Sequence, residues 1–209
     1  MNANNQFSER EPAEMFKKIL VPTDFSGYSE KTVEFAAKIP GVTEVVLVHI
    51  MEKGQTDNPA WMSGPQRETA QERIFRHLQK NRIYLEEHSI QVRDVVMDAG
   101  ENDISSCILD SAKTQGVDLI LIGARGKGIM HEILLGSVSE KVLKAASCDV
   151  LITRYNGLIP GMEHPETASE RSGQEIFEKV LCPVDFSRPS EACIRSISAI
   201  DGVKEVLLL

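Results

Sequence analysis

The residues best suited to chemistry in this sequence lie in one glycine-rich turn. The turn contains three spaced glycines and a serine where a helix is expected to begin: Gly123, Gly126, Gly136 and Ser137. Glycine lets the backbone approach a ligand closely. The unpaired N–H groups at the start of a helix attract phosphate, because they lie at the positive end of the helix dipole. Arg125 and Lys127 add positive charge to the turn. The segment therefore predicts a phosphate-binding turn.

The same residues also allow a purely structural interpretation. Ser137 and Glu140 have the spacing of a capping box, in which each residue caps the first turn of the helix. Glycines between a strand and a helix often serve only the turn. The spacing is not that of a dinucleotide fingerprint, and no Gly-Lys-Ser/Thr opens the helix as in a P-loop. Spacing and physics alone leave both interpretations open.

The turn must be positioned by strands and helices that alternate along the chain. Continuous apolar runs predict buried strands at 18–22, 44–50, 92–97, 118–123 and 149–153. Helical spacing predicts helices at 29–38, at about 66–88, after a cap at Asn102, and at 137–146. Strands that are apolar throughout are typical of a parallel sheet covered on both faces. The sequence therefore predicts an α/β fold with a five-stranded parallel sheet and helices on both faces.

Ligands bind to such sheets beyond the carboxyl ends of the strands, where the strand order reverses. This rule brings Thr23 and Asp24, Ile50, and the turn from Gly123 onward to one crevice. Asp24 has an alternative role as a cap of the first helix. His49, at the end of an apolar strand, is expected to be a core or rim histidine and not a catalyst.

Composition limits the class of partner and the compartment. The net charge of −8 argues against a nucleic-acid backbone as the partner. The four cysteines have no C-x-x-C spacing and are expected to be reduced packing thiols of a cytosolic protein. The N-terminus does not resemble a signal peptide, and no apolar run is long enough to span a membrane. We therefore expect a cytoplasmic protein that does not interact with membranes.

The chain also contains an internal repeat. Residues 16–26 are matched by residues 177–187, and the match continues without a gap to Leu209, with about half of the positions identical. We expect a disordered leader at 1–15, a complete domain at 16–155, a linker at 156–175, and a truncated second copy at 176–209. The second copy would contain a strand, a helix and a strand, which cannot form a core alone. It must pack on the first unit, exchange with another chain or stay partly disordered.

Two motifs of the sequence resemble the universal stress protein family. Residues 21–26, Val-Pro-Thr-Asp-Phe-Ser, are similar to the first strand and turn of that family. The turn from Gly123 to Ser137 matches the ATP-binding signature G-x2-G-x9-G-[ST], with Ala124 where a serine is frequent. The resemblance covers 16–155, and 176–209 as a tandem copy. It implies a Rossmann-like fold of the adenine nucleotide alpha hydrolase type, the ATP-holding branch of the family, and a homodimer.

The resemblance also implies roles for particular residues. Those expected around the nucleoside are Pro22, Thr23, Asp24, Ile50, Ile122 and Gly123. Those expected around the phosphates are Arg125, Gly126, Gly136, Ser137, Val138 and Ser139. The ligand would be ATP or AMP, and a Mg²⁺ or Mn²⁺ ion would accompany a triphosphate.

Three functions remain open from the sequence. The first is a regulatory stress-response module that binds an adenine nucleotide. The second is a slow ATPase or nucleotidyl-transfer enzyme, which needs a base or a water-orienting group beside the phosphate. The nearest titratable residues, His131 and Glu132, are not convincing candidates for that role. The third is an interaction module that holds no nucleotide.

Overall fold

The computed structural model describes residues 16–52, 69–124, 135–154 and 176–209. Strands and helices alternate through its larger unit: β1 (Lys18–Pro22), α1 (Gly27–Ala36), β2 (Glu44–Met51), α2 (Ala70–Glu87), β3 (Gln91–Asp98), α3 (Ile104–Gln115), β4 (Leu119–Gly123), α4 (Ser137–Ala145) and β5 (Asp149–Thr153). The predicted α/β alternation is confirmed. In the part of the chain that is described, no helix is both long and apolar enough to cross a membrane.

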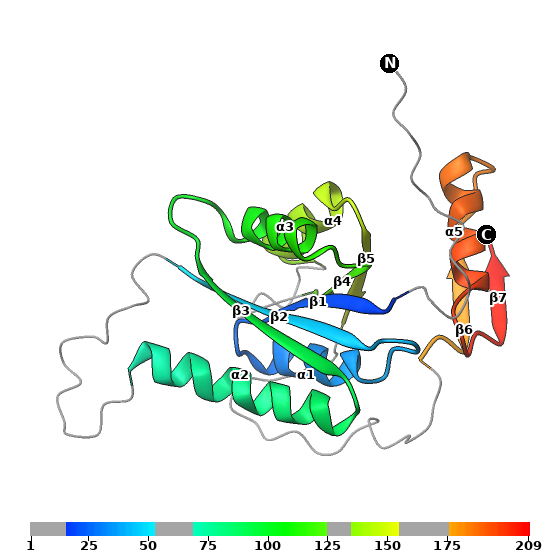
Figure 1. Ribbon diagram of the computed structural model, residues 1–209. Coiled ribbons are helices and arrows are strands. Elements are labelled where there is room, and N and C mark those ends of the chain that lie inside the picture. The colour runs from blue at the N-terminus through cyan, green and yellow to red at the C-terminus, as the bar shows by residue number, and fades with distance from the viewer. Residues whose placement is uncertain (1–15, 53–68, 125–134, 155–175) are drawn as a thin grey trace.

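The five strands form one parallel sheet in the order β3-β2-β1-β4-β5. Helices α1 and α2 cover one face of the sheet, and α3 and α4 cover the other (Figure 1). The chain moves outward from β1 to β3 and then returns to place β4 on the other side of β1. The strand order therefore reverses between β1 and β4, and the carboxyl ends of these two strands mark the expected ligand edge.

Alternation along the strands divides the apolar side chains between two cores. In β1, Ile19 and Val21 face the core under α1 and α2, whereas Leu20 faces the core under α3 and α4. All three side chains are fully buried. Full burial of such a side chain stabilises the fold by about 1.5–3 kcal/mol. The sheet is thus fixed from both sides, and its carboxyl edge is a rigid support for loops.

Side chains cap the amino ends of the first three helices. The caps are Ser26 for α1, Thr69 for α2 and Asp103 for α3. The prediction that Asn102 caps α3 is wrong by one residue, because the Asp103 carboxylate accepts the N–H of Ser106 at 3.1 Å. Helix α2 begins at Ala70, and residues 66–68 of the predicted helix lie outside the described ranges.

A smaller unit repeats the first strand–helix–strand pattern. It contains β6 (Lys179–Cys182), α5 (Arg188–Ser198) and β7 (Glu205–Leu208), with its two strands parallel. Ion pairs at equivalent positions join the two strands in each unit. Lys18 of β1 pairs with Glu44 of β2 at 3.1 Å, and Lys179 of β6 pairs with Glu205 of β7 at 3.0 Å. Phe25 and Phe186 also have the same left-handed φ of 59°. The repeat seen in the sequence is therefore a repeat of local structure.

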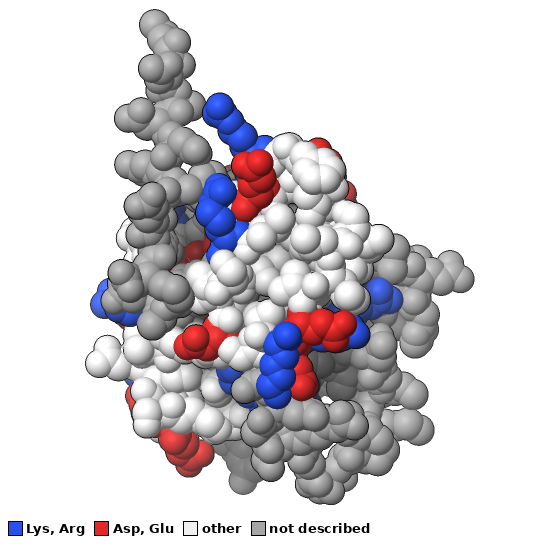
Figure 2. All heavy atoms as spheres, turned by 90° about the vertical axis from the view of Figure 1, so that its right-hand side faces the viewer, with Lys and Arg blue, Asp and Glu red and all other residues white. Residues whose placement is uncertain are grey.

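The smaller unit contacts the larger one through a few apolar side chains. Ile176, Phe177 and Ile200 pack against the core under α1 and α2. Most of β7 is exposed, and the ring of Phe186 is 88% exposed. Figure 2, which shows the molecule from the right-hand side of Figure 1, has acidic and basic side chains next to one another in small groups, with uncharged surface between the groups. The predicted leader and linker lie outside the described ranges, so the proposed domain boundaries stay predictions.

Candidate functional site

The amino end of α4 differs from those of the other helices described. Its cap residue is Gly136, and no side chain of the described residues caps it. The predicted capping box is wrong, because Ser137 is already inside the helix and Glu140 instead pairs with Lys144. The first intrahelical bond is donated by the N–H of Glu140 to the carbonyl of Gly136 at 2.9 Å. The N–H groups that precede it at this helix start can serve an external acceptor such as phosphate.

Three hydrogen bonds fix the start of α4 against the carboxyl end of the sheet. The hydroxyl of Ser139 donates to the carbonyl of Gly123 at 2.7 Å. The N–H of Gly136 donates to the carbonyl of Ala124 at 2.7 Å. The N–H of Ala124 in turn donates to the carbonyl of Thr153, also at 2.7 Å. Ser139 is one of the residues predicted beside the phosphates, and its buried side chain holds the helix to β4. It therefore contributes to the site by positioning the helix.

A hollow of about 460 Å³ lies beside the start of α4. Its lining comes from the end of β2, the loop between β3 and α3, and the first turns of α4: Glu52, Ala99, Gly100, Asn102, Asp103, Ile104, Ser105, Ser137, Val138 and Lys141. This volume is within the range of about 300–1,000 Å³ that is usual for small-molecule sites. Sequence reasoning placed Ser137 and Val138 here but missed the β3–α3 loop. The signal was available, because the carboxyl end of β3 lies on the same edge of the sheet.

Three charged side chains line this hollow: the carboxylates of Glu52 and Asp103 and the ammonium of Lys141. The ammonium of Lys141 lies 3.7 Å from the Asp103 carboxylate. The Ser105 hydroxyl, the Ser106 N–H and Lys141 together lower the pKa of Asp103 to about 2. Lys141 is four residues after Ser137, so the two side chains share one face of α4. The α4 side of the hollow thus combines helix N–H groups, a serine hydroxyl and an ammonium, and donors of these kinds bind anionic ligands.

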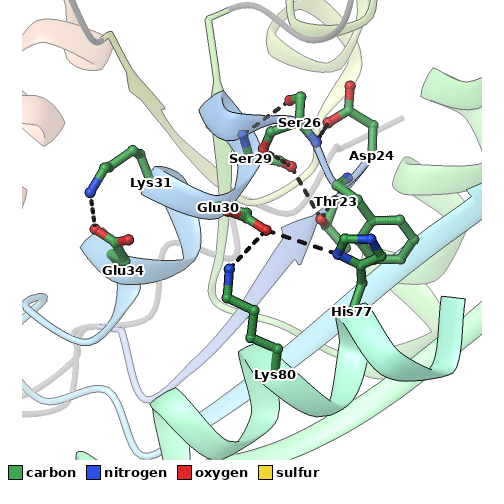
Figure 3. Close-up of polar contacts among 10 residues, drawn as sticks. Thr23, Asp24, Ser26, Ser29, Glu30, Lys31, Glu34, His77 and Lys80 are labelled. Carbon is green, nitrogen blue, oxygen red and sulfur yellow. Dashed lines mark hydrogen bonds and ion pairs between the residues drawn. The ribbon is translucent and has the colours of Figure 1, made fainter. Parts of the chain in front are cut away.

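The loop after β1 is held by its own side chains (Figure 3). The Thr23 hydroxyl accepts the Phe25 N–H and donates to Ser29, both at 3.2 Å. The Asp24 carboxylate accepts the N–H of Ser26 at 2.9 Å. Asp185 makes the same bond to Ser187 at 2.9 Å in the smaller unit. Asp24 therefore has a structural role, although it supports the capping residue and does not itself cap the helix.

Three stacked rings reinforce this loop. Phe25 stacks on His49 with ring centroids 4.2 Å apart, and on His77 of α2 at 4.8 Å. The Nδ1 atom of His49 lies 2.8 Å from the carbonyl oxygen of Thr23. His77 in turn lies 3.9 Å from Glu30, which also pairs with Lys80 of α2 (Figure 3). His49 is a buried, hydrogen-bonded histidine, as predicted. The contacts of Phe25 with His49 and His77 were not predicted, because they join segments that are far apart in sequence.

The other predicted site residues fall into two groups. Ile50 and Ile122 have buried side chains in the core under α3 and α4, and Pro22 and Gly123 are partly exposed at the ends of β1 and β4. The glycine-turn residues 125–134 lie outside the described ranges, and with them Arg125, Gly126, Lys127, His131 and Glu132.

Comparison with known proteins identifies the family to which this chain belongs. A sequence model described as the universal stress protein family matches residues 15–154. The chain therefore belongs to the universal stress protein family. Universal stress protein MJ0577 of Methanocaldococcus jannaschii is 30% identical over 158 residues, which cover 67% of this chain and 96% of that protein. Its solved structure superposes with a TM-score of 0.56 at 28% identity, covering 69% of this chain and 99% of the other.

Two further solved structures share the fold at lower identity. A universal stress protein of Archaeoglobus fulgidus has a TM-score of 0.58 at 19% identity, covering 94% of this chain and 67% of that one. The fold likeness therefore extends into the smaller unit. A universal stress protein solved in complex with cAMP has a TM-score of 0.50 at 17% identity, covering 68% of this chain and 98% of the other.

Proposed function

We propose that this chain is a stress-response module that binds an adenine nucleotide, with ATP as the preferred ligand, and that it acts by binding and not by catalysis. The observation that supports this most is the uncapped amino end of α4. It opens on a hollow of about 460 Å³ beside the ends of the parallel strands. Helix N–H groups in such a position recur in phosphate sites.

The residues at this edge match the chemistry of a nucleotide. Phosphate would be bound by the N–H groups and hydroxyl of Ser137, the N–H of Val138 and the ammonium of Lys141. Arg125 and Gly126 would complete this cradle, as the resemblance implies. The nucleoside would lie against the partly exposed residues at the end of β1, with Ile50 and Ile122 as its apolar support. A Mg²⁺ or Mn²⁺ ion would neutralise part of the triphosphate charge.

Two further facts favour an adenine nucleotide. A protein with the same fold has been solved with cAMP, although an identity of 17% shows only the fold. The chain itself has every fixed position of the signature G-x2-G-x9-G-[ST], from Gly123 to Ser137. ATP, which has three phosphates for these donors, is the ligand that we propose for this member.

Analysis of the nucleotide that co-purifies with the full chain tests this function. Chromatography after denaturation is expected to release an adenine nucleotide from the wild type and little from Gly136→Val, whose side chain would block the approach of phosphate to α4. Thermal unfolding of both proteins without ligand checks that the variant folds. Absence of any nucleotide, together with no thermal shift on adding ATP, would favour the interaction module. Multiple-turnover phosphate release that disappears in Gly136→Val would favour the ATPase.

We also propose that two chains associate in the cytoplasm through β5. This strand is an edge of the sheet and is largely half-buried, which leaves one side available for pairing. Light scattering on the eluted protein is expected to give about twice the chain mass of 23.2 kDa. A mass of one chain at micromolar concentration would contradict the dimer without affecting the nucleotide site.

A further inference from the structure

Two cysteines of the smaller unit lie in direct contact. Cys182 ends β6 and Cys193 lies in α5, and their sulfur atoms are 3.8 Å apart. Both are free thiols. Cys182 is 1% exposed, whereas Cys193 is exposed to solvent. One thiol of the pair is therefore accessible to a reagent, and the other lies next to it.

The fold itself brings these two positions together. In the larger unit the equivalent positions are Val21 of β1 and Thr32 of α1, and both are fully buried between strand and helix. The smaller unit keeps the same strand, cap and helix, with Ser187 capping α5 as Ser26 caps α1. Only the smaller unit has a thiol at both positions. The contact between the two sulfurs thus follows from the repeated strand–helix packing.

We propose that Cys182 and Cys193 form a redox-active dithiol, which a hydroperoxide converts to an intramolecular disulfide that joins β6 to α5. A disulfide needs a sulfur–sulfur distance of about 2.05 Å, so the two sulfurs must approach by about 1.8 Å. Closure of the disulfide requires rotation of the exposed Cys193 side chain to supply this movement. This inference does not depend on nucleotide binding.

The chemistry balances with one molecule of hydroperoxide. The Cys193 thiolate attacks the peroxide, the O–O bond breaks, and an alcohol or water leaves while the sulfur becomes a sulfenic acid. The Cys182 thiolate then attacks that sulfur, the S–O bond breaks, and water leaves as the disulfide forms. The two sulfurs together lose two electrons, and the peroxide oxygens gain them.

The surroundings of the two cysteines slow their oxidation. Partial burial of the Cys193 sulfur, then its contact with Cys182, raises the pKa of this thiol, and the Asp149 carboxylate raises it further. The thiolate is the reactive form, so a raised pKa slows the first step at neutral pH. We therefore expect closure at millimolar peroxide and not during purification under a reductant.

The sequence around the pair makes the product simple to detect. Trypsin does not cleave at Arg188, because Pro189 follows it, so residues 180–195 form one peptide that contains both cysteines. The full chain is oxidised with hydrogen peroxide, and its remaining thiols are blocked with N-ethylmaleimide. The protein is then digested with trypsin, and the peptide masses are measured by mass spectrometry. The expected peptide is about 2 Da lighter than the reduced form and has no maleimide, and dithiothreitol restores both blocking sites.

Variants separate this proposal from accidental oxidation. Cys107→Ser/Cys148→Ser is expected to close as the wild type does, whereas Cys182→Ser is expected to leave Cys193 without an intramolecular partner. Two maleimides on the peptide after oxidation, or a Cys193–Cys193 link between chains, would each overturn the proposal.

Discussion

The hydroxyl of Ser139 in α4 donates a hydrogen bond of 2.7 Å to the carbonyl oxygen of Gly123 at the end of β4. Because Ser139 is buried, Ser139→Ala leaves that carbonyl without its partner. We predict a loss of about 1–3 kcal/mol in the free energy of unfolding. We also predict weaker nucleotide binding, since the start of α4 is less well fixed. Urea unfolding and an ATP titration measure the two effects.

The exposed Ser147 provides the matched control for this substitution. Ser147→Ala is expected to change neither quantity. Equal stability of the Ser139→Ala and Ser147→Ala proteins would show that the bond to Gly123 does not hold the helix.

Lys141 is predicted to select for the phosphate part of the ligand. Its side chain is 61% exposed and lines the hollow together with Ser137. Lys141→Ala is expected to weaken ATP binding about fivefold, which corresponds to roughly 1 kcal/mol for an exposed charge. Adenosine, which has no phosphate, is expected to bind both proteins equally. Calorimetric titration with each ligand measures the difference.

Lys144, which lies two turns beyond Ser137 and does not line the hollow, is the control for charge alone. It is 72% exposed and pairs with Glu140. Lys144→Ala is expected to bind ATP as the wild type does. If Lys144→Ala and Lys141→Ala weaken binding equally, general attraction explains the effect and Lys141 has no specific role.

The Asp103 cap predicts a particular response of stability to acid. Hydrogen bonds from Ser105 and Ser106, with Lys141 nearby, lower the pKa of Asp103 from its ordinary value to about 2. A carboxylate with a lowered pKa stabilises the folded state above about pH 4, and this contribution is lost as the pH falls towards 2. Asp103→Asn removes it. The difference in Tm between the wild type and this variant should therefore shrink between pH 4 and pH 2.

Asp110→Asn, on the exposed side of α3, controls for a general charge effect. A difference in Tm that stays constant for Asp103→Asn across this pH range would contradict the role given to its carboxylate.

Phe25 and Phe186, which share a left-handed backbone conformation, allow a direct test of the ring stack. Phe25 lies between His49 and His77, whereas Phe186 has the same φ of 59° and an exposed ring. Phe25→Leu is expected to lose about 1 kcal/mol of stability, the usual value of an aromatic pair. Phe186→Leu is expected to lose almost none. Equal losses in urea unfolding would show that the stack does not stabilise the loop after β1.

Much of the fold was predictable because the strands are continuous apolar runs and the helices have clear apolar stripes. The helix starts were less certain, since Asn102 and Asp103 are adjacent and both are good caps. Ser137 and Glu140 have the spacing of a capping box, yet the chain enters the helix one residue earlier, at Gly136.

The parts of the candidate site that could be predicted are those that one short stretch of sequence specifies. The spacing from Gly123 to Ser137 and the turn at Asp24 are local patterns. The hollow beside Asp103 and the stack of Phe25 on His77 join segments that are far apart in sequence. Such contacts arise from the order of the strands and the packing of α2, which no local pattern specifies.

Calorimetric titration of ATP into the full chain, freed of co-purified nucleotide, tests the central claim most directly. We predict one ATP bound per chain, with Gly136→Val abolishing binding while its thermal unfolding remains cooperative. Absence of binding by ATP, AMP and adenosine to the folded wild-type protein would contradict the account.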